Sequence, residues 1–192
     1  MIEISRNESG EVKGPVILDS GERRQFDSGA VRDIAEGKGR CDLLPLDIIG
    51  YYLCQCAPAD DIDRYKLVGG ILGHLNAFIR KGNINCIYAS LSYFIDNTYN
   101  SLVSALIEVS KHYEEGAKKY AERNWEKGIP CHCYIDSGVR HLLKWLDDWH
   151  DEPHDRAFVW NMLGLLWTVE NHPDYNDLPH VQIVQVRDSA DE

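Results

Sequence analysis

The sequence predicts an all-α protein: a helical bundle with short N-terminal and C-terminal extended segments. Three observations support this fold class. Apolar residues recur at steps of three and four through most of the 192 residues, as they do on one face of an α-helix. Serine, proline and glycine stand where these segments begin and end, which are the positions they favour at helix termini. Runs typical of strands are confined to residues 15–18 and 181–186.

The first helices are expected to be short. One is capped by Ser28, ends at Gly37 and is followed by a basic, glycine-containing loop. A second covers residues 43–54. Two longer helices follow at about 65–81 and 84–96, with a turn at Lys81-Gly82-Asn83. The chain length fits one domain, so residues 1–192 are interpreted as a single domain with a helical insertion at 60–97.

The helix at 101–123 has the clearest periodicity, and Gly116 beside its apolar stripe would let a neighbouring helix approach closely. The next helix is expected to start at Ser137 and to bury Trp149. The last, from about Pro153 to Val169, is apolar on nearly all faces, which indicates burial in a bundle or at a subunit interface and favours a homo-oligomer, a dimer or tetramer. The predicted stripe of the long helix is Leu102, Leu106, Val109, Tyr113, Ala117 and Tyr120.

The composition limits the possible partners. The formal net charge of −11 opposes binding to a nucleic-acid backbone. The chain has no apolar run of roughly 18 residues or more, and its polar start does not resemble a signal peptide, so a cytoplasmic protein without membrane association is expected. Its six cysteines are then expected to be reduced. Zinc between the pairs Cys54/Cys56 and Cys131/Cys133 is an alternative, although their one-residue spacing is unusual for zinc sites.

Polar clusters suggest where chemistry could occur. The turn at 149–155 gathers carboxylates and imidazoles, and Mg²⁺ prefers oxygen ligands. Acidic residues also cluster at helix starts simply because they favour the helix dipole. Asn161, in the most apolar helix, could bind a base or ribose, or satisfy a backbone group. Arg140 and Lys144 share a helix face suited to phosphate, the alternative being ordinary surface charge.

Several stretches together resemble a family. The sequence is similar to phage and prophage proteins described as dATP/dGTP diphosphohydrolases, related to the MazG-type all-α nucleotide pyrophosphohydrolases. The stretches run in order over about two thirds of the chain: Ser28-Gly29-Ala30-Val31-Arg32-Asp33, Glu36-Gly37-Lys38-Gly39-Arg40, Tyr113-Glu114-Glu115-Gly116-Ala117-Lys118-Lys119-Tyr120, Arg123-Asn124-Trp125-Glu126-Lys127-Gly128, Ser137-Gly138-Val139-Arg140-His141, and Asp151-Glu152-Pro153-His154 continuing to Trp160-Asn161.

The resemblance implies hydrolysis of a purine (deoxy)nucleoside triphosphate to the monophosphate and pyrophosphate, with Mg²⁺ or Mn²⁺ held by carboxylates. It implies catalytic roles for Glu114, Asp151 and Glu152, and metal binding by Glu114, Glu115, Asp151, Glu152 and Asp155. The implied nucleotide-binding residues are Arg32, Lys38, Arg40, Lys118, Lys119, Arg123, Asn124, Trp125, Arg140, His141, Lys144, His154 and Asn161.

The chain departs from the MazG pattern of an E-E-x-x-E helix followed by an E-x-x-D helix. The second motif is present as Glu152-Pro153-His154-Asp155, at a helix start. In the first, Lys118 stands where a third acid is expected. A non-catalytic protein that sequesters a nucleotide is therefore the alternative function, and a purely structural helical protein is a third possibility.

Overall fold

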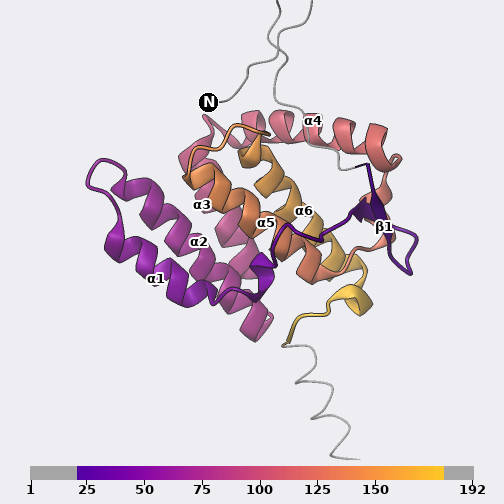
Figure 1. Cartoon of the computed structure of the whole chain (residues 1–192), viewed down its shortest axis with the longest axis horizontal. Helices are drawn as coiled ribbons and strands as arrows, with labels where there is room; N and C mark the ends of the chain where they lie inside the picture. The colour runs from indigo at the N-terminus through magenta and orange to yellow at the C-terminus, as the bar shows by residue number, and fades with distance from the viewer. Residues whose placement is uncertain (1–20, 180–192) are drawn as a thin grey trace, which may run out of the picture.

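A computed structural model describes residues 21–179, and it confirms the all-α class (Figure 1). The extended segments expected at 15–18 and 181–186 lie outside these residues. Short 3₁₀ turns occur at Cys41–Leu43, Asn124–Lys127 and Pro173–Tyr175. The strands and helices of the described part are β1 (Arg23–Gln25), β2 (Val31–Asp33), α1 (Leu46–Cys56), α2 (Ile62–Lys81), α3 (Asn85–Thr98), α4 (Leu102–Tyr120), α5 (Cys131–Leu146) and α6 (His154–Asn171).

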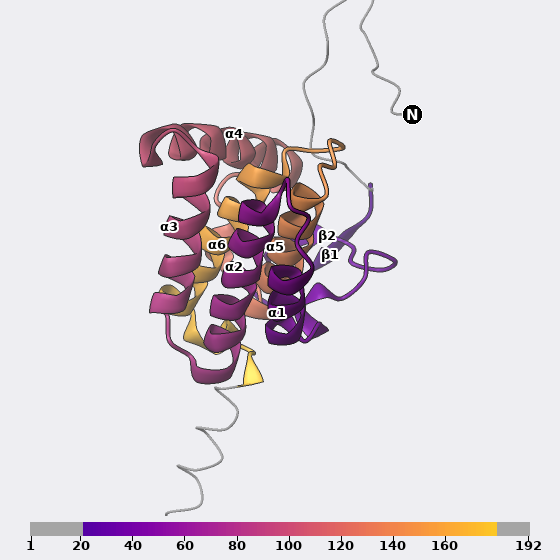
Figure 2. The same ribbon diagram turned by 90° about the vertical axis from the view of Figure 1, so that its left-hand side faces the viewer.

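The helices form one bundle, and the hairpin lies on its surface. Helix α1 packs on α2 and α5 packs on α6, while α4 lies across one end of the bundle and contacts α6 (Figures 1 and 2). The β1–β2 hairpin is antiparallel, with Arg24 opposite Arg32. No helix in the part of the chain that is described has the length and apolarity needed to cross a membrane.

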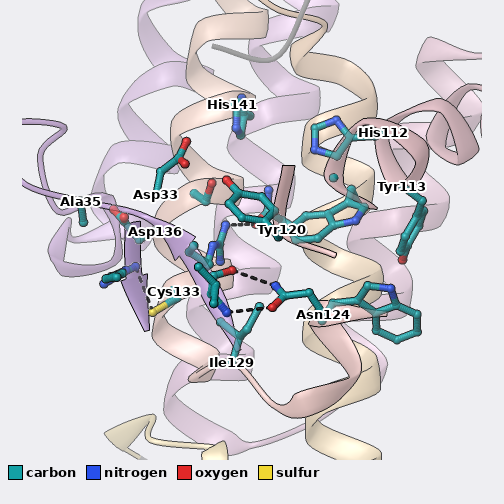
Figure 3. A pocket seen from close by; sticks show the side chains of 18 of the residues that line it. Asp33, Ala35, His112, Tyr113, Tyr120, Asn124, Ile129, Cys133, Asp136 and His141 are labelled. Atoms are coloured by element: carbon teal, nitrogen blue, oxygen red, sulfur yellow. Dashed lines mark hydrogen bonds between the residues drawn. The ribbon is translucent and has the colours of Figure 1, made fainter. Parts of the chain in front are cut away.

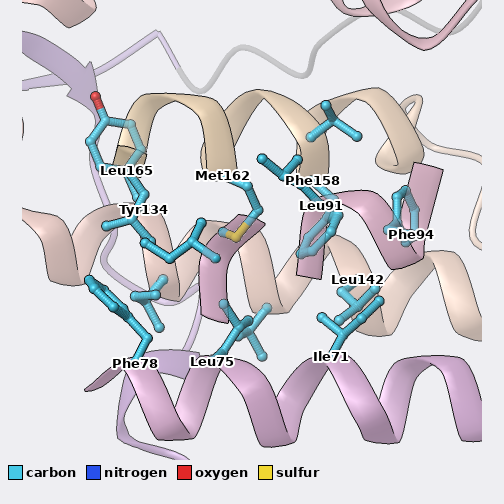
Figure 4. Packing of buried hydrophobic residues seen from close by; sticks show 14 of the residues in the cluster. Ile71, Leu75, Phe78, Leu91, Phe94, Tyr134, Leu142, Phe158, Met162 and Leu165 are labelled. Carbon is cyan, nitrogen blue, oxygen red and sulfur yellow. The ribbon is translucent and has the colours of Figure 1, made fainter. Parts of the chain in front are cut away.

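A single hydrophobic core joins these helices (Figure 4). Phe94 of α3 packs against Phe158 of α6, with ring centroids 4.6 Å apart, and against Trp145 of α5 at 5.1 Å. Buried side chains of α2, including Leu75 and Phe78, face the same centre. Helices α2 and α3 thus share the core of the chain, and the interpretation of 60–97 as an insertion stays a prediction.

Helices α5 and α6 approach closely where glycines replace side chains. A Cβ atom added at Gly164 of α6 would overlap the ring of Tyr134. One added at Gly138 of α5 would lie 2.7 Å from Cε of Met162. Because the interior is close-packed, these two glycines set the distance between the helices that build the site described below.

Two helix predictions need correction. In α4, Ala105 and Val109 are buried, whereas Leu102 is 59% exposed, because a helix lying across the end of the bundle buries only a narrow stripe. Gly116 faces open space, with no atom within 4 Å of an added Cβ. Helix α5 begins at Cys131, not at Ser137, and Trp149 is half exposed beyond its end.

Helix α6 is buried within one chain. Its neighbours are α3, α4 and α5, and most of its apolar side chains are inaccessible to solvent. The apolar character of this helix is therefore explained without a second subunit. The homo-oligomer stays a prediction, and it now depends on other surfaces.

The prediction of a helix starting at Ser28 was wrong, because this segment forms the hairpin. The backbone N–H of Phe26 donates to the Ala30 carbonyl at 2.9 Å, and Gly29 adopts a φ of +80°, which glycine tolerates and a helix excludes. Contacts from residues distant in sequence also favour the strand. The Ser28 hydroxyl, for example, donates to the carbonyl of Gly128 at 2.5 Å.

Candidate functional site

One large pocket opens between the hairpin, α4, α5 and the start of α6 (Figure 3). Its volume is about 1000 Å³, at the upper end of the range of roughly 300–1000 Å³ usual for small-molecule sites. The hairpin contributes Arg32 and Asp33, and the loop after it contributes Lys38. The predicted site residues that line it are Arg32, Lys38, Glu114, Arg123, Asn124, Trp125, Arg140, His141, Lys144, Glu152 and Asn161.

Aromatic side chains form one part of the pocket wall. The ring of Tyr113 on α4 packs edge-on against Trp125, with centroids 5.6 Å apart, and lies 6.1 Å from Trp160 of α6. The ring of Trp125 also packs edge-on against Trp167, with ring centroids 5.2 Å apart. These rings present flat apolar surface on which a planar base can stack.

Arg32 lies beside this aromatic wall. Its guanidinium carbon is 5.4 Å from the Tyr134 ring centroid and 5.6 Å from that of Trp160, within the range of cation–π attraction. Its Nη2 donates to Oδ1 of Asn161 at 3.2 Å. The Asn161 amide also donates to the Ala157 carbonyl at 2.8 Å, so this buried residue orients Arg32 and satisfies a backbone group at once.

Cationic side chains gather on α5 and the loop after β2. Arg140 donates to the carbonyls of Lys38 and Gly39, both at 3.1 Å, and to the carboxylate of Asp136 at 2.5 Å. It therefore holds the glycine-containing loop against α5. Burial lowers the pKa of Lys38, whose ammonium lies 4.0 Å from Asp33.

The pocket has no excess of positive charge. Its basic lining residues are matched in number by acidic ones, among them Asp33, Asp136 and Glu152. The neighbourhood is nevertheless far less negative than the chain as a whole, whose net charge is −11. A polyphosphate bound there would need an accompanying cation to balance its charge.

The five carboxylates implied as metal ligands do not converge. Glu114 is exposed and paired with Lys118, as an i,i+4 pair on the surface of α4. Three of the other acids are held by separate partners, and Glu152 belongs to the group described next. Glu115 accepts from Arg156 at 2.7 Å, Asp155 accepts from the Tyr99 hydroxyl at 2.9 Å, and Asp151 accepts from Lys144 at 2.8 Å.

A different group of possible ligands does converge, where α5 meets the start of α6. His141, Glu152 and His154 place one ligand atom each within 4.8 Å of one another, and among residues 21–179 this is the one such group of three or more. His141 Nδ1 lies 3.0 Å from His154 Nδ1 and 3.5 Å from Glu152 Oε1. His154 Nδ1 lies 3.8 Å from the same carboxylate oxygen. This arrangement can hold a metal ion.

Burial affects all three side chains of this group. The pKa of His141 lies well below its ordinary value because the ring is desolvated and His154 is close. Desolvation also lowers the pKa of His154 and raises that of Glu152. In the absence of a cation, both imidazoles are therefore neutral at pH 7, which is the form that binds metals.

Four other residues implied in nucleotide binding are exposed, lie outside the pocket lining or are paired with acidic side chains. Arg40 is exposed and pairs with Asp42 at 2.5 Å, and Lys118 is outside the pocket lining. Lys119 lies behind the wall and holds Asp33 at 2.6 Å. Arg123 lines the pocket, but its side chain is 77% exposed and pairs with Glu126.

Sequence reasoning missed several residues of the wall. His112 of α4 lines the pocket beside Trp160, with centroids 5.4 Å apart, and burial together with Arg156 lowers its pKa to about 3. Asp33 had no predicted role, and Tyr113 was predicted only as part of the apolar stripe of its helix, although both line the pocket. Their position next to residues that were assigned was the available signal.

The cysteines provide no comparable group. All six are free, and no cysteine of the described residues joins a cluster of three or more possible ligands. Burial raises the pKa of the Cys131 thiol. Cys133 lines the pocket and accepts a hydrogen bond from Arg24 at 3.3 Å.

Comparison with known proteins relates this geometry to a family. Residues 96–178 match the family model described as dATP/dGTP diphosphohydrolase, N-terminal. No curated protein and no solved structure matches the chain. The matched segment includes α4, α5, α6 and the turns between them. It supplies most of the pocket wall and the whole His141–Glu152–His154 group, whereas the stretches at 28–40 precede it. The resemblance inferred from the sequence is thus confirmed over residues 96–178, the part of the chain that is similar to the dATP/dGTP diphosphohydrolase N-terminal family.

Proposed function

We propose that this protein binds a purine (deoxy)nucleoside triphosphate in the pocket and hydrolyses it to the monophosphate and pyrophosphate. The observation that supports this function is the presence of stacking and phosphate-binding groups in a single pocket, built largely by the segment that matches the family. The base lies against Tyr113, Trp125 and Trp160, where aromatic stacking stabilises it.

The phosphates extend toward Lys38, Arg140 and Lys144. Charge-assisted hydrogen bonds from these side chains stabilise the oxygens of the leaving pyrophosphate. Arg32, oriented by Asn161, lies between the two regions and is suited to the sugar or the first phosphate. In this arrangement β2 and the loop after it cover the nucleotide from the side opposite α4.

The family resemblance implies Mg²⁺ or Mn²⁺. Mg²⁺ prefers about six oxygen ligands in octahedral geometry, usually a few carboxylates, waters and substrate phosphates. Among the described residues no group of carboxylates converges, since the one candidate group contains two imidazoles. The protein residues therefore do not fit a resident Mg²⁺, and no step of the reaction is assigned to one. Mg²⁺ in solution is instead bound to the triphosphate and enters as part of the substrate.

A product analysis tests this function. The protein is incubated with each common NTP and dNTP in the presence of Mg²⁺, and again with Mn²⁺, and the products are separated by chromatography. We expect a purine (d)NTP to give its monophosphate and pyrophosphate, and EDTA to stop the reaction. Release of orthophosphate and a diphosphate would contradict the assigned bond cleavage.

Sequestration without cleavage is the second candidate, and one observation favours it. Lys118 stands at the third-acid position of the first MazG motif and neutralises Glu114, leaving that motif without a free pair of carboxylates. In that case the same incubation returns intact nucleotide, in stoichiometric amount, when the protein is denatured. The two outcomes separate an enzyme from a binding protein directly.

A further inference from the structure

The donor atoms of His141, Glu152 and His154 form a closed triangle. The same three atoms, two Nδ1 nitrogens and one Oε1, define edges of 3.0, 3.5 and 3.8 Å. Ligands bound at about 2.0–2.2 Å to one ion, at angles of roughly 90–110°, lie about 3.0–3.5 Å from one another. Two edges meet this condition, and the third requires a shift of about 0.3 Å.

The tautomer of His154 is set by a neighbouring carboxylate. Its Nε2 lies 2.8 Å from Oδ1 of Asp151, and the other oxygen of Asp151 accepts from Lys144 at 2.8 Å. A proton on Nε2 leaves the lone pair of Nδ1 directed at the triangle. Metal-binding histidines commonly donate their second N–H to a carboxylate in this way, which fixes the ring and strengthens the ligand.

Glu152 lacks the donors that a carboxylate normally finds when removed from water. Its side chain is 13% exposed, and among residues 21–179 no group donates a hydrogen bond to it; the two histidine nitrogens lie 3.5 and 3.8 Å from its Oε1. A carboxylate that is largely removed from water and has no hydrogen-bond donor is destabilising. A cation in the triangle would compensate this charge and would also relieve the contact between the two imidazole nitrogens.

The group also lies between two cavities. Its His141 and Glu152 line the large pocket, and Glu152 and His154 line a smaller one of about 270 Å³ formed with Trp149 and His150. An ion can therefore reach the triangle while still facing a ligand in the large pocket. A site with three protein ligands and an open side is the arrangement found in metal centres that bind an additional molecule.

We propose that His141, Glu152 and His154 bind one divalent transition-metal ion of the imidazole-preferring class, such as Zn²⁺, and not Mg²⁺. Two nitrogens and one carboxylate suit Zn²⁺, Co²⁺, Ni²⁺ or Fe²⁺, whereas Mg²⁺ requires an oxygen shell. Asp151 is a positioning residue, held by Lys144 and acting through His154. The proposal revises the metal implied by the resemblance, and it is tested without nucleotide, so its outcome is independent of the proposed hydrolysis.

The test is a metal titration of the full chain after treatment with a chelator. Co²⁺ is added, its visible absorption is followed, and Zn²⁺ and then a large excess of Mg²⁺ are used as competitors. We expect a spectrum that saturates at one equivalent of Co²⁺, is removed by Zn²⁺ and is unaffected by Mg²⁺. Zn²⁺ should also raise the melting temperature, because an ion that binds only the folded state stabilises it.

Variants locate the site. His141→Ala and Glu152→Gln should weaken Co²⁺ binding more than Asp151→Asn, for which a loss of about 10–100-fold is typical of an outer hydrogen-bond partner. The matched control is His74→Ala on α2, an exposed histidine outside the group. Near-ultraviolet circular dichroism checks that each variant is folded, and Glu152→Gln and Asp151→Asn preserve side-chain shape if His141→Ala is unstable.

Two results would overturn the proposal. One is a wild-type chain with no stoichiometric Co²⁺ or Zn²⁺ binding, in which case the 3.0 Å contact is a hydrogen bond between two histidines. The other is stoichiometric binding that persists in both His141→Ala and Glu152→Gln. Nucleotide hydrolysis by a chain that fails this test would leave the proposed function intact and place the metal elsewhere.

Discussion

The side chain of Asn124 pairs with the backbone of Val31 at the outer edge of the hairpin. Its side-chain Oδ1 accepts from the Val31 backbone N–H at 2.9 Å, and its Nδ2 donates to the Val31 carbonyl at 2.8 Å (Figure 3). One amide thereby makes both hydrogen bonds that an adjacent strand would make. This contact fixes β2 against the turn after α4 and so positions Arg32, the next residue, in the pocket.

Replacing this amide should destabilise the fold. Asn124→Ala leaves a partly buried N–H and carbonyl of Val31 without partners, and we expect a loss of about 1–3 kcal/mol in the free energy of unfolding measured by urea titration. Asn171→Ala is the matched control, because that amide is exposed at the end of α6. Weaker nucleotide binding with unchanged stability would instead show that Asn124 contacts the ligand directly.

The contact between His132 and Asp177 predicts a pH dependence of stability. The hydrogen bond to Asp177, assisted by Cys133, raises the pKa of His132 to about 10 from an ordinary value of 6.5. Protonated His132 therefore stabilises the fold fully below pH 6.5, and this contribution is lost as the pH rises through 10.

The measurement is the free energy of unfolding of wild type and His132→Gln at several pH values. The difference between them should shrink from pH 6.5 to 10. A difference that stays constant over this range would show that the ion pair with Asp177 contributes nothing to stability.

Adding a methyl group at Gly164 should destabilise the protein. The new Cβ would overlap the fully buried ring of Tyr134, and overpacking of this kind typically costs about 1–3 kcal/mol. Gly73→Ala on α2 should have the opposite sign, a gain of roughly 0.5–1 kcal/mol, because nothing lies within 4 Å of an added Cβ there. Thermal unfolding of both variants checks the contrast, and stabilisation by Gly164→Ala would contradict the close packing of α5 and α6.

Removing the charge of Lys38 should discriminate among ligands. Lys38→Met should weaken binding of a triphosphate by about 1.5–3 kcal/mol, the range for a charged hydrogen bond, and should affect the corresponding nucleoside little. Calorimetric titration with both ligands measures the two losses. Lys111→Met, on the exposed face of α4, is the control. Equal losses of binding free energy for nucleoside and triphosphate would show that Lys38 stabilises the loop and does not bind phosphate.

We expect the interface of the predicted homo-oligomer to lie on α4 and not on α6. One face of α4 exposes four apolar side chains within its first two turns: Leu102, Val103, Leu106 and Ile107. Light scattering should give at least twice the chain mass of 21.9 kDa, and Val103→Glu with Ile107→Glu should reduce it to one chain. A monomer at micromolar wild-type concentration would refute the prediction.

Local sequence patterns were sufficient to predict the positions of most of the helices. Residues 65–81 and 84–96, separated by Gly82, were predicted close to α2 and α3, since helical periodicity and a left-handed glycine are properties of neighbouring residues. Ser101 was correctly predicted to begin α4, where its hydroxyl accepts from the Ser104 backbone N–H at 3.1 Å. These elements depend on interactions within about one helical turn.

The start of α5 depended on more distant contacts. Asp177, far along the chain, accepts a hydrogen bond from the backbone N–H of His132 at 3.0 Å and so stabilises the first turn of α5. Ser137 is a residue type that often begins a helix, but here it lies inside one. The strand at Val31 depends in the same way on Asn124. Neither partner can be identified from the residues around the element, because the contact exists only after the chain has folded.

The sequence by itself determined the helical class, the family resemblance and the types of side chain available for phosphate and metal binding. The tertiary structure decided which of them meet. Lys118 and Arg156 neutralise Glu114 and Glu115, whereas the packing of α5 on the start of α6 brings His141 to within 3.0 Å of His154 and 3.5 Å of Glu152. Periodicity specifies which face of a helix is apolar, but the distance between polar atoms on two helices depends on how closely their backbones approach, here through Gly138 and Gly164.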